Sequence, residues 1–425
     1  MTPDTVVVLA KSPRPGLVKT RLSPVFSPAE SAALAAAAIR DTLDVALATG
    51  ARRTIVAWDG PAASWMPAGV RIVPQRGSSL DERLENVFHD VREDAVDAPT
   101  LLVGMDTPQL TVDDLRSDWR TRDAVLGLSA DGGYWAIGFR RYVPGAVLGV
   151  PMSTRRTGAE QLTRLKKLDL DVELLTVLRD VDTPVDAAQV ARQAPRSRFG
   201  RLHRRIVEAP CAPMTLFDAA LTGGSVEVRV DATDADAPQR VSGLIDFRAW
   251  QRLSEADEVL LSRCEGPVLD IGCGPGRFVE ALACRGLPAL GVDLSKTAVA
   301  CSRARGASAL VRDVHDRLPA EGRWGTILLA DGNIGIGGDP LGLLRRCREL
   351  LHPGAAALVE TSTDSAADTR TTVTLHGPSG RHSHALPWAV VGAHALVRLA
   401  AMAGFVAVED WRVGGRAFVM LRLAG

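Results

Sequence analysis

The sequence predicts an α/β protein made of two doubly wound domains, and three observations support this fold class. The chain has 425 residues, more than one hydrophobic core usually organises. Short apolar runs typical of buried parallel strands alternate with helical patterns through both halves. Residues 192–205 contain six arginines together with proline and glycine, a clear break in composition. We therefore expect a domain at residues 1–194, a linker at 195–214 and a second domain at 215–425.

The composition excludes several functional classes. The formal net charge is zero, so no bulk electrostatic attraction to nucleic acid or to an anionic membrane is expected. The longest apolar stretch near the start, residues 32–39, is too short to span a bilayer. The six cysteines include no C-x-x-C pair, which argues against structural zinc and favours a reduced, cytoplasmic protein.

One stretch, VLDIGCGPGRF at residues 268–278, organises the second half of the chain. A short apolar strand contains Asp270, and a glycine turn and a helical pattern follow it. Glycine allows the backbone to turn tightly and to approach a ligand closely. A second short strand ends in Asp293, placed to bind the two hydroxyls of a ribose. The glycines of the turn are Gly272, Gly274 and Gly276.

This arrangement resembles motifs I and II of class I S-adenosylmethionine-dependent methyltransferases. The D-x-G-x-G-x-G form differs from the G-x-G-x-x-G pattern of dinucleotide-binding proteins. The resemblance implies a Rossmann-like domain in which Asp270 and the glycine turn lie near the methionine part of S-adenosylmethionine. It also implies that Asp293 binds ribose and that Asp313, after a later strand, binds the adenine amino group. The methyl acceptor and a general base are not readable from the sequence.

The first half opens with a β-branched run at residues 5–10, a pattern typical of a central parallel strand. The loop at residues 11–22 follows directly and is rich in cations. Cations at the carboxyl end of a first strand are well placed to hold phosphates. A solvated basic loop is the alternative interpretation. The candidate nucleotide-binding residues are Lys11, Arg14, Lys19 and Arg21.

Three acids in this half each follow a predicted strand. They are Asp106 in GMDTPQL, Asp131 in SADGGYWAIGF and Asp182 in RDVDTPVDAAQV. Taken singly, each is explained as a helix cap or a turn residue. Taken together beside a cationic loop, they indicate a site for Mg²⁺ or Mn²⁺ and phosphate, because such cations take one or two protein carboxylates plus substrate phosphates.

The stretches AKSPRPGLVKTRL, GMDTPQL, DGGYWAIG and VDTPVDAAQV resemble the DUF2064 group of small GT-A-type glycosyltransferases over residues 5–195. That group is similar to the nucleotidyltransferases that make molybdopterin guanine dinucleotide, activated phospholactate and activated Kdo sugars. The resemblance implies that the first loop grips a nucleotide diphosphate or triphosphate. It implies that Asp106 and Asp182 bind the metal and that Asp131 faces the acceptor or the sugar. Asp131 is therefore also the candidate catalytic base.

The first loop departs from the glycine-rich loop usual in nucleotidyltransferases, because it contains Pro13, Pro15 and only Gly16. Glycosyl transfer from a nucleotide sugar and nucleotidyl transfer from a triphosphate both stay open, as does a non-catalytic binding module serving the methyltransferase. We expect a bifunctional enzyme that glycosylates and methylates a small molecule in secondary metabolism, without nucleic acid or membrane partners. Its expected ligands are a nucleotide sugar or nucleoside triphosphate, Mg²⁺ or Mn²⁺, S-adenosylmethionine and a small-molecule acceptor.

Overall fold

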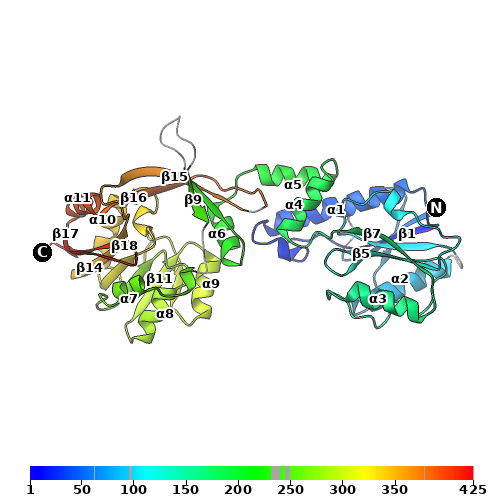
Figure 1. Cartoon of the computed structure of the whole chain (residues 1–425), viewed down its shortest axis with the longest axis horizontal. Coiled ribbons are helices and arrows are strands. Elements are labelled where there is room, and N and C mark those ends of the chain that lie inside the picture. The colour runs from blue at the N-terminus through cyan, green and yellow to red at the C-terminus, as the bar shows by residue number, and fades with distance from the viewer. Residues whose placement is uncertain (62, 95–97, 231–239, 245–248, 378, 425) are drawn as a thin grey trace. The chain divides into compact units, whose positions relative to one another are not determined.

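The computed structural model describes residues 1–425 apart from 62, 95–97, 231–239, 245–248, 378 and 425. The chain forms two compact units, Met1–Ala209 and Pro210–Gly425 (Figure 1). Each unit contains a seven-stranded sheet of mainly parallel strands covered by helices, which confirms the predicted fold class. None of the helices in the described part of the chain is long and apolar enough to cross a membrane.

The first sheet has the strand order β3-β2-β1-β4-β6-β5-β7. β6 runs antiparallel to both of its neighbours, and the other pairs are parallel. The strands are β1 (Thr5–Lys11), β2 (Arg53–Asp59), β3 (Val70–Pro74), β4 (Thr100–Gly104), β5 (Ala124–Ser129), β6 (Tyr134–Phe139) and β7 (Val172–Leu178). The helices are α1 (Pro28–Ala48), α2 (Leu80–Asp94), α3 (Thr157–Lys167), α4 (Pro184–Gln193) and α5 (Arg198–Glu208), with 3-10 turns at Thr20–Leu22 and Asp113–Leu115.

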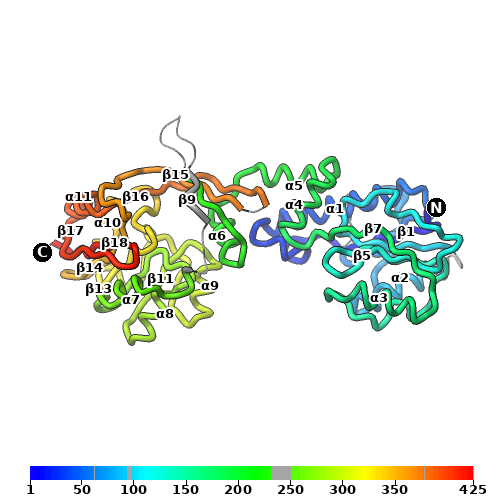
Figure 2. Tube along the Cα trace, viewed as in Figure 1, coloured from blue at the N-terminus to red at the C-terminus, as the bar shows by residue number. Residues whose placement is uncertain are grey.

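Both faces of β1 are buried, which explains its unbroken apolar run. Val6 and Val8 pack with residues of α1, whereas Val7 packs on the opposite face with residues of α2 and α3. Figure 2 shows the same layers along the chain trace, with α1 on one side of β1 and β5 and with α2 and α3 on the other. The carboxyl ends of β1 and β4 therefore form an edge between two packed layers, where ligands of α/β proteins bind.

The second sheet has the order β12-β11-β10-β13-β14-β18-β17, and the final hairpin of β17 and β18 is antiparallel. A four-stranded sheet, β16-β15-β8-β9, adjoins it in the same unit. The strands are β8 (Glu227–Val230), β9 (Arg240–Leu244), β10 (Val268–Ile271), β11 (Ala289–Asp293), β12 (Ala309–Val311), β13 (Trp324–Leu329), β14 (Leu351–Thr361), β15 (Asp368–His376), β16 (Leu386–Val391), β17 (Phe405–Val413) and β18 (Arg416–Leu423). The helices are α6 (Pro213–Leu221), α7 (Glu255–Leu261), α8 (Arg277–Cys284), α9 (Lys296–Ala304), α10 (Pro340–Leu350) and α11 (Ala393–Ala403), with 3-10 turns at Ala249–Gln251 and Asn333–Gly335.

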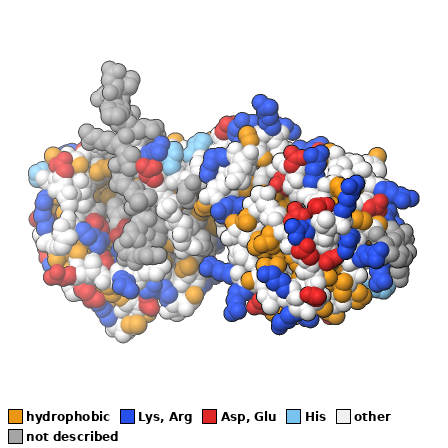
Figure 3. All heavy atoms as spheres, turned by 45° about the vertical axis from the view of Figure 1, so that its right-hand side comes forward, with side chains coloured by type: hydrophobic (Ala, Val, Ile, Leu, Met, Phe, Trp, Pro, Cys, Tyr) orange, Lys and Arg blue, Asp and Glu red, His pale blue; other side chains and the backbone are white. Residues whose placement is uncertain are grey.

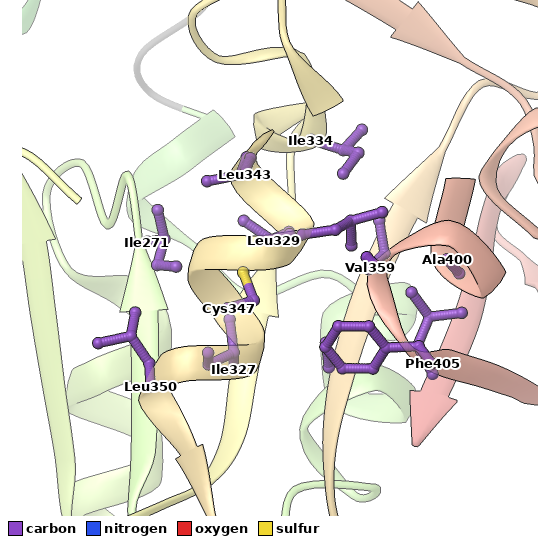
Figure 4. Close-up of a cluster of buried hydrophobic side chains, with 14 of the residues drawn as sticks. Ile271, Ile327, Leu329, Ile334, Leu343, Cys347, Leu350, Val359, Ala400 and Phe405 are labelled. Carbon is purple, nitrogen blue, oxygen red and sulfur yellow. The ribbon is translucent and has the colours of Figure 1, made fainter. Parts of the chain in front are cut away.

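The largest core cluster of this unit lies between the sheet and helices α10 and α11 (Figure 4). Ile327 and Leu329 of β13 meet Cys347 of α10, and Phe405 closes the side next to α11. This packing fixes β13 against its helices, and so it fixes the turn that follows β13 at the carboxyl edge.

The segment expected to be a linker, residues 195–214, contains α5 and belongs largely to the first unit. The segment belongs to the first unit because a side chain of α1 caps the start of α5. The carboxylate of Asp41 on α1 accepts hydrogen bonds from the backbone N–H groups of Arg198 (2.9 Å) and Phe199 (2.8 Å) at the start of α5. Phe199 and His203 are buried, while the arginines of the outer face stay in solvent. The high arginine content marks an amphipathic helix here, and the compact units divide after Ala209.

Replacement of Asp41 by alanine tests this cap. Loss of an acceptor for two helix N–H groups costs about 1–2 kcal/mol, so we expect amide exchange in α5 to accelerate about tenfold or more. Hydrogen–deuterium exchange measured by mass spectrometry reports this directly. The control is Asp44→Ala, which removes only an exposed ion pair with Arg198 and should change exchange little. Unchanged exchange in Asp41→Ala would contradict the assignment.

Candidate functional sites

A cavity of about 880 Å³ lies at the carboxyl ends of β1 and β4 in the first unit. Most of the residues predicted to act in this unit line it. The predicted residues among its lining are Lys11, Lys19, Arg21, Asp106, Asp131 and Asp182. Arg14 of the same loop is exposed and is not part of the lining. Figure 3 shows that both acidic and basic side chains lie on the visible face of this unit.

Lys19 is held by carboxylates, although the sequence assigned it to phosphate. Its Nζ lies 2.7 Å from an oxygen of Asp106 and 3.5 Å from an oxygen of Asp182, and it donates to the Val181 carbonyl. Only 8% of its side chain is exposed. Its backbone is left-handed (φ 50°), a conformation that costs energy for a residue with a side chain. The lysine charge therefore offsets the repulsion between two neighbouring acids.

Asp180 also lines this cavity, and the sequence analysis missed it. The Ser129 hydroxyl donates to one of its oxygens at 3.0 Å, and the other oxygen is buried without a partner among the described residues. Burial, and then the charge of Asp106, raise the pKa of Asp180 to about 7. The D-x-D spacing with Asp182 directly after β7 was the signal that could have revealed it.

These acids fit a divalent cation that also needs ligands from a substrate. Within the described residues, no group of three or more His, Cys, Asp or Glu side chains could hold a metal ion. Mg²⁺ commonly takes one or two carboxylates and completes its shell with water and phosphate oxygens. Asp106 and Asp182, which share Lys19, supply two such carboxylates.

Asp131 also lies at the cavity, on a turn whose shape depends on glycine. Its carboxylate accepts a hydrogen bond from the Gly133 N–H at 2.9 Å. Gly132 has φ 95°, and a Cβ there would lie 2.0 Å from the Arg155 carbonyl oxygen. The Asp-Gly-Gly turn is therefore pressed against the loop before α3. The exposed carboxylate keeps free lone pairs that face solvent.

In the second unit the glycine turn is tied to the acid that follows β11. Asp293 accepts hydrogen bonds from the N–H groups of Gly274 (2.9 Å) and Ser295 (2.8 Å). The Asn333 side chain donates to the carbonyls of Ile271 (2.8 Å) and Gly272 (3.1 Å). All three glycines of the turn have positive φ, and a Cβ on Gly276 would lie 2.1 Å from the Ser302 hydroxyl. Alternation of glycine in this stretch is thus required by backbone geometry.

The three predicted acids of this unit lie on adjacent strands at one edge of the sheet. Asp270 lies within β10, Asp293 ends β11 and Asp313 follows β12. Asp313 accepts the His315 N–H at 2.9 Å and is partly exposed. Asp270 is only 1% exposed, and one of its oxygens has no partner among the described residues. Burial raises the pKa of Asp270 to about 7, and Arg277 only partly opposes this effect.

Comparisons with known proteins divide the chain in the same way. Residues 33–154 match the family described as "Uncharacterized protein conserved in bacteria (DUF2064)", and residues 236–410 match the family described as "Methyltransferase domain". The chain is 32% identical over 184 residues to a 3-phospho-D-glycerate guanylyltransferase of Phenylobacterium zucineum, covering 41% of this chain and 84% of that protein. The chain belongs to the DUF2064 family through its first unit and carries a methyltransferase domain in its second.

Two solved structures are also similar. A protein assigned as a nucleotide-diphospho-sugar transferase from Desulfovibrio desulfuricans G20 is 26% identical, with a TM-score of 0.44, covering 48% of this chain and 95% of that one. A SAM-dependent methyltransferase from Bacteroides fragilis, in complex with S-adenosyl-L-homocysteine, is 21% identical, with a TM-score of 0.41, covering 50% and 95%.

The methyltransferase unit also contains a cluster of five charged side chains that the sequence analysis did not assemble. We call it the charge network. Its guanidinium groups bridge carboxylates that come from three different parts of the unit. The sequence carries no local signal for these pairs, because the partners are far apart along the chain. The members are Asp257, Arg277, Asp331, Glu360 and Arg416.

The raised pKa of Asp270 predicts how stability responds to pH. The folded methyltransferase unit binds the Asp270 proton more tightly than the unfolded chain, so this residue costs stability increasingly as pH rises from about 4 to 7. Asp270→Asn removes that cost. We expect the variant to gain about 1–3 kcal/mol more over the wild type at pH 8 than at pH 5. Pulse proteolysis in urea, followed through peptides of residues 255–425, measures it. An equal difference at both pH values would refute the assignment.

Proposed function

We propose that the DUF2064 unit transfers a nucleotidyl group from a nucleoside triphosphate to an anionic small molecule, in a reaction that depends on Mg²⁺ or Mn²⁺. The observation that carries this proposal is the cavity in which acids from three strand ends meet the cationic first loop. The similarity to the 3-phospho-D-glycerate guanylyltransferase of Phenylobacterium zucineum, of whose length the chain covers 84%, supports guanosine triphosphate as the donor. It also supports a phosphorylated carboxylic acid as the acceptor.

In this proposal the acidic side chains of the cavity bind the metal and the basic ones bind phosphate. Asp106 and Asp182 would hold the metal, which would neutralise the charge that develops on a leaving diphosphate. Lys11 and Arg21 then bind phosphate oxygens. Lys19 already lies between the acids and becomes available to the nucleotide when a cation takes over that neutralising role. Asp131 faces the acceptor and accepts the proton of the attacking oxygen when that oxygen is protonated.

Glycosyl transfer from a nucleotide sugar is the second candidate, and the first loop favours it. A loop with Pro13, Pro15 and a single glycine offers fewer backbone N–H groups to a triphosphate than a glycine-rich loop does. The two reactions release different products from the donor, pyrophosphate in nucleotidyl transfer and a nucleoside diphosphate in glycosyl transfer. A non-catalytic binding module would bind the nucleotide and release neither.

The metal assignment predicts a loss of nucleotide affinity in Asp106→Asn. Because a carboxylate ligand is removed, we expect Mg²⁺-dependent binding of guanosine triphosphate to weaken about tenfold or more, while binding without metal changes little. Titration calorimetry on the full chain, with and without Mg²⁺, measures both quantities. Asp113→Asn is the matched control, since Asp113 is an exposed acid outside the cavity. Unaltered metal dependence in Asp106→Asn would end the proposal for this unit.

We also propose that the methyltransferase unit takes its methyl group from S-adenosylmethionine, bound at the carboxyl edge of β10, β11 and β12. The glycine turn leaves room for close approach of the methionine part, and the N-terminal end of α8 lies directly after it. Asp293 keeps lone pairs for the ribose hydroxyls beyond its two backbone hydrogen bonds. Asp313, next to this edge, is the candidate for the adenine amino group. The fusion favours consecutive modification of one small molecule by the two units.

Asp293→Asn tests this cofactor site. A carboxylate binds two ribose hydroxyls through charge-assisted hydrogen bonds, so we expect affinity for S-adenosylhomocysteine to fall about 10–100-fold. Titration calorimetry provides the measurement, and hydrogen exchange in β10 checks that the glycine turn stays folded. Asp316→Asn, an exposed acid nearby on the same edge, should bind like the wild type. Wild-type affinity in Asp293→Asn would show that the ribose lies elsewhere.

A further inference from the structure

The charge network lies at the edge of the sheet where we place S-adenosylmethionine. Arg277 is the first residue of α8, directly after the glycine turn. Asp331 follows β13, and Glu360 lies near the carboxyl end of β14. β10 and β13 are neighbours in the sheet although β11 and β12 come between them in sequence. This change of direction in strand order is where open α/β sheets bind their ligands.

The contacts within the charge network are short and numerous. Arg416 binds Glu360 through two hydrogen bonds (2.7 and 2.6 Å) and reaches Asp257 at 2.6 Å and Asp331 at 3.3 Å. Arg277 reaches the same Asp331 oxygen at 2.8 Å. The Asp331 N–H donates to Glu360 at 2.5 Å, and Asp331 itself adopts a left-handed backbone with φ 53°. The surrounding contacts therefore hold Asp331 in a conformation that an isolated aspartate avoids.

Three carboxylates and two guanidinium groups leave one formal negative charge on the charge network. Burial would raise the pKa of Asp257, but the Ser254 N–H and the two arginines more than offset this and lower it. The two guanidinium groups are charged at any relevant pH. The network therefore stays negative, and it does so in a partly buried place where a charge is poorly screened.

Two buried polar atoms next to the glycine turn have no hydrogen-bond partner among the described residues. Arg277 is only 6% exposed, and its Nε has no partner among the described residues. Asp270, beside the glycine turn, has a buried oxygen in the same condition. Asn333, two residues after Asp331, holds the turn through the carbonyls of Ile271 and Gly272. The short segment of residues 331–333 thus holds the glycine turn, where we place the methyl donor, and also carries one of the acids of the charge network.

We propose that this residual negative charge makes the methyltransferase unit prefer S-adenosylmethionine over S-adenosylhomocysteine, the spent form of the same cofactor. S-adenosylmethionine carries a sulfonium, an ammonium and a carboxylate, and its net charge is one positive. After methyl transfer the sulfur is a neutral thioether, and the net charge is zero. The two ligands have nearly the same shape, so charge is the property by which one site can separate them. The inference rests on the proposed cofactor site.

The test compares the affinities of the two ligands in variants of opposite charge. Glu360→Gln removes one negative charge, so we expect S-adenosylmethionine to bind about five- to fifteenfold more weakly relative to S-adenosylhomocysteine. This is the effect of one unit charge at roughly 10 Å in an effective dielectric of about 20–30. Arg416→Gln removes a positive charge and should shift the same ratio in the opposite direction, while Arg416→Lys should leave it unchanged. Titration calorimetry of the full chain with each ligand supplies the ratios.

Glu321→Gln is the matched control. Glu321 also binds an arginine, Arg346 at 2.5 Å, but it precedes β13 and so lies at the opposite end of that strand. Both affinities should stay within about twofold of the wild type in this variant. If Glu360→Gln does not fold, Asp331→Asn carries the same expectation.

The outcomes separate this inference from the proposed function. Opposite shifts of the ratio in Glu360→Gln and Arg416→Gln support it, because a purely structural role would weaken both ligands in both variants. Equal losses for both ligands, or an unchanged ratio, overturn it while the cofactor site stands. If the wild-type chain binds neither ligand, the proposed cofactor site fails and the inference fails with it.

Discussion

The structure depends on one constraint: acids placed at the carboxyl ends of buried strands must be neutralised where they stand. A carboxylate removed from water without a partner is expensive, and it either finds compensation or takes up a proton. The two units meet this constraint in different ways. In the DUF2064 unit a lysine from the first loop lies between Asp106 and Asp182. In the methyltransferase unit backbone N–H groups bind Asp293, and two arginines bind the acids of the charge network.

The means of neutralisation determines what each edge can accept. Lys19 carries a compact charge on a flexible stem, so in the proposed metal site a divalent cation and its phosphates would take over its position between the acids. The arginines of the charge network are held by several bonds each, and they fix geometry more than they leave room for exchange. This difference agrees with the ligands proposed for the two units: a metal-bound nucleotide at the first edge and S-adenosylmethionine at the second.

The sequence was most informative where function and local backbone geometry coincide. The glycine turn at residues 272–276 and Asp293 could be placed because their spacing alone requires a strand, a tight turn and a helix. The cation–acid pairs were not predictable, since Lys19 and Asp182 are 163 residues apart and Asp257 and Arg416 are 159 residues apart. Asp180 was overlooked because Asp182, the other acid of the D-x-D pair, already matched the VDTPVD motif.

The buried attachment of α5 has a practical consequence for separating the two activities. A truncation after residue 194 would follow the break in composition, yet it would remove the helix that covers part of α1 and leave Asp41 and its neighbours in water. The cut that respects the hydrogen bonds falls after Ala209, where the compact units part. Expression of either half alone should therefore treat the arginine-rich segment as the last helix of the first half rather than as a tether.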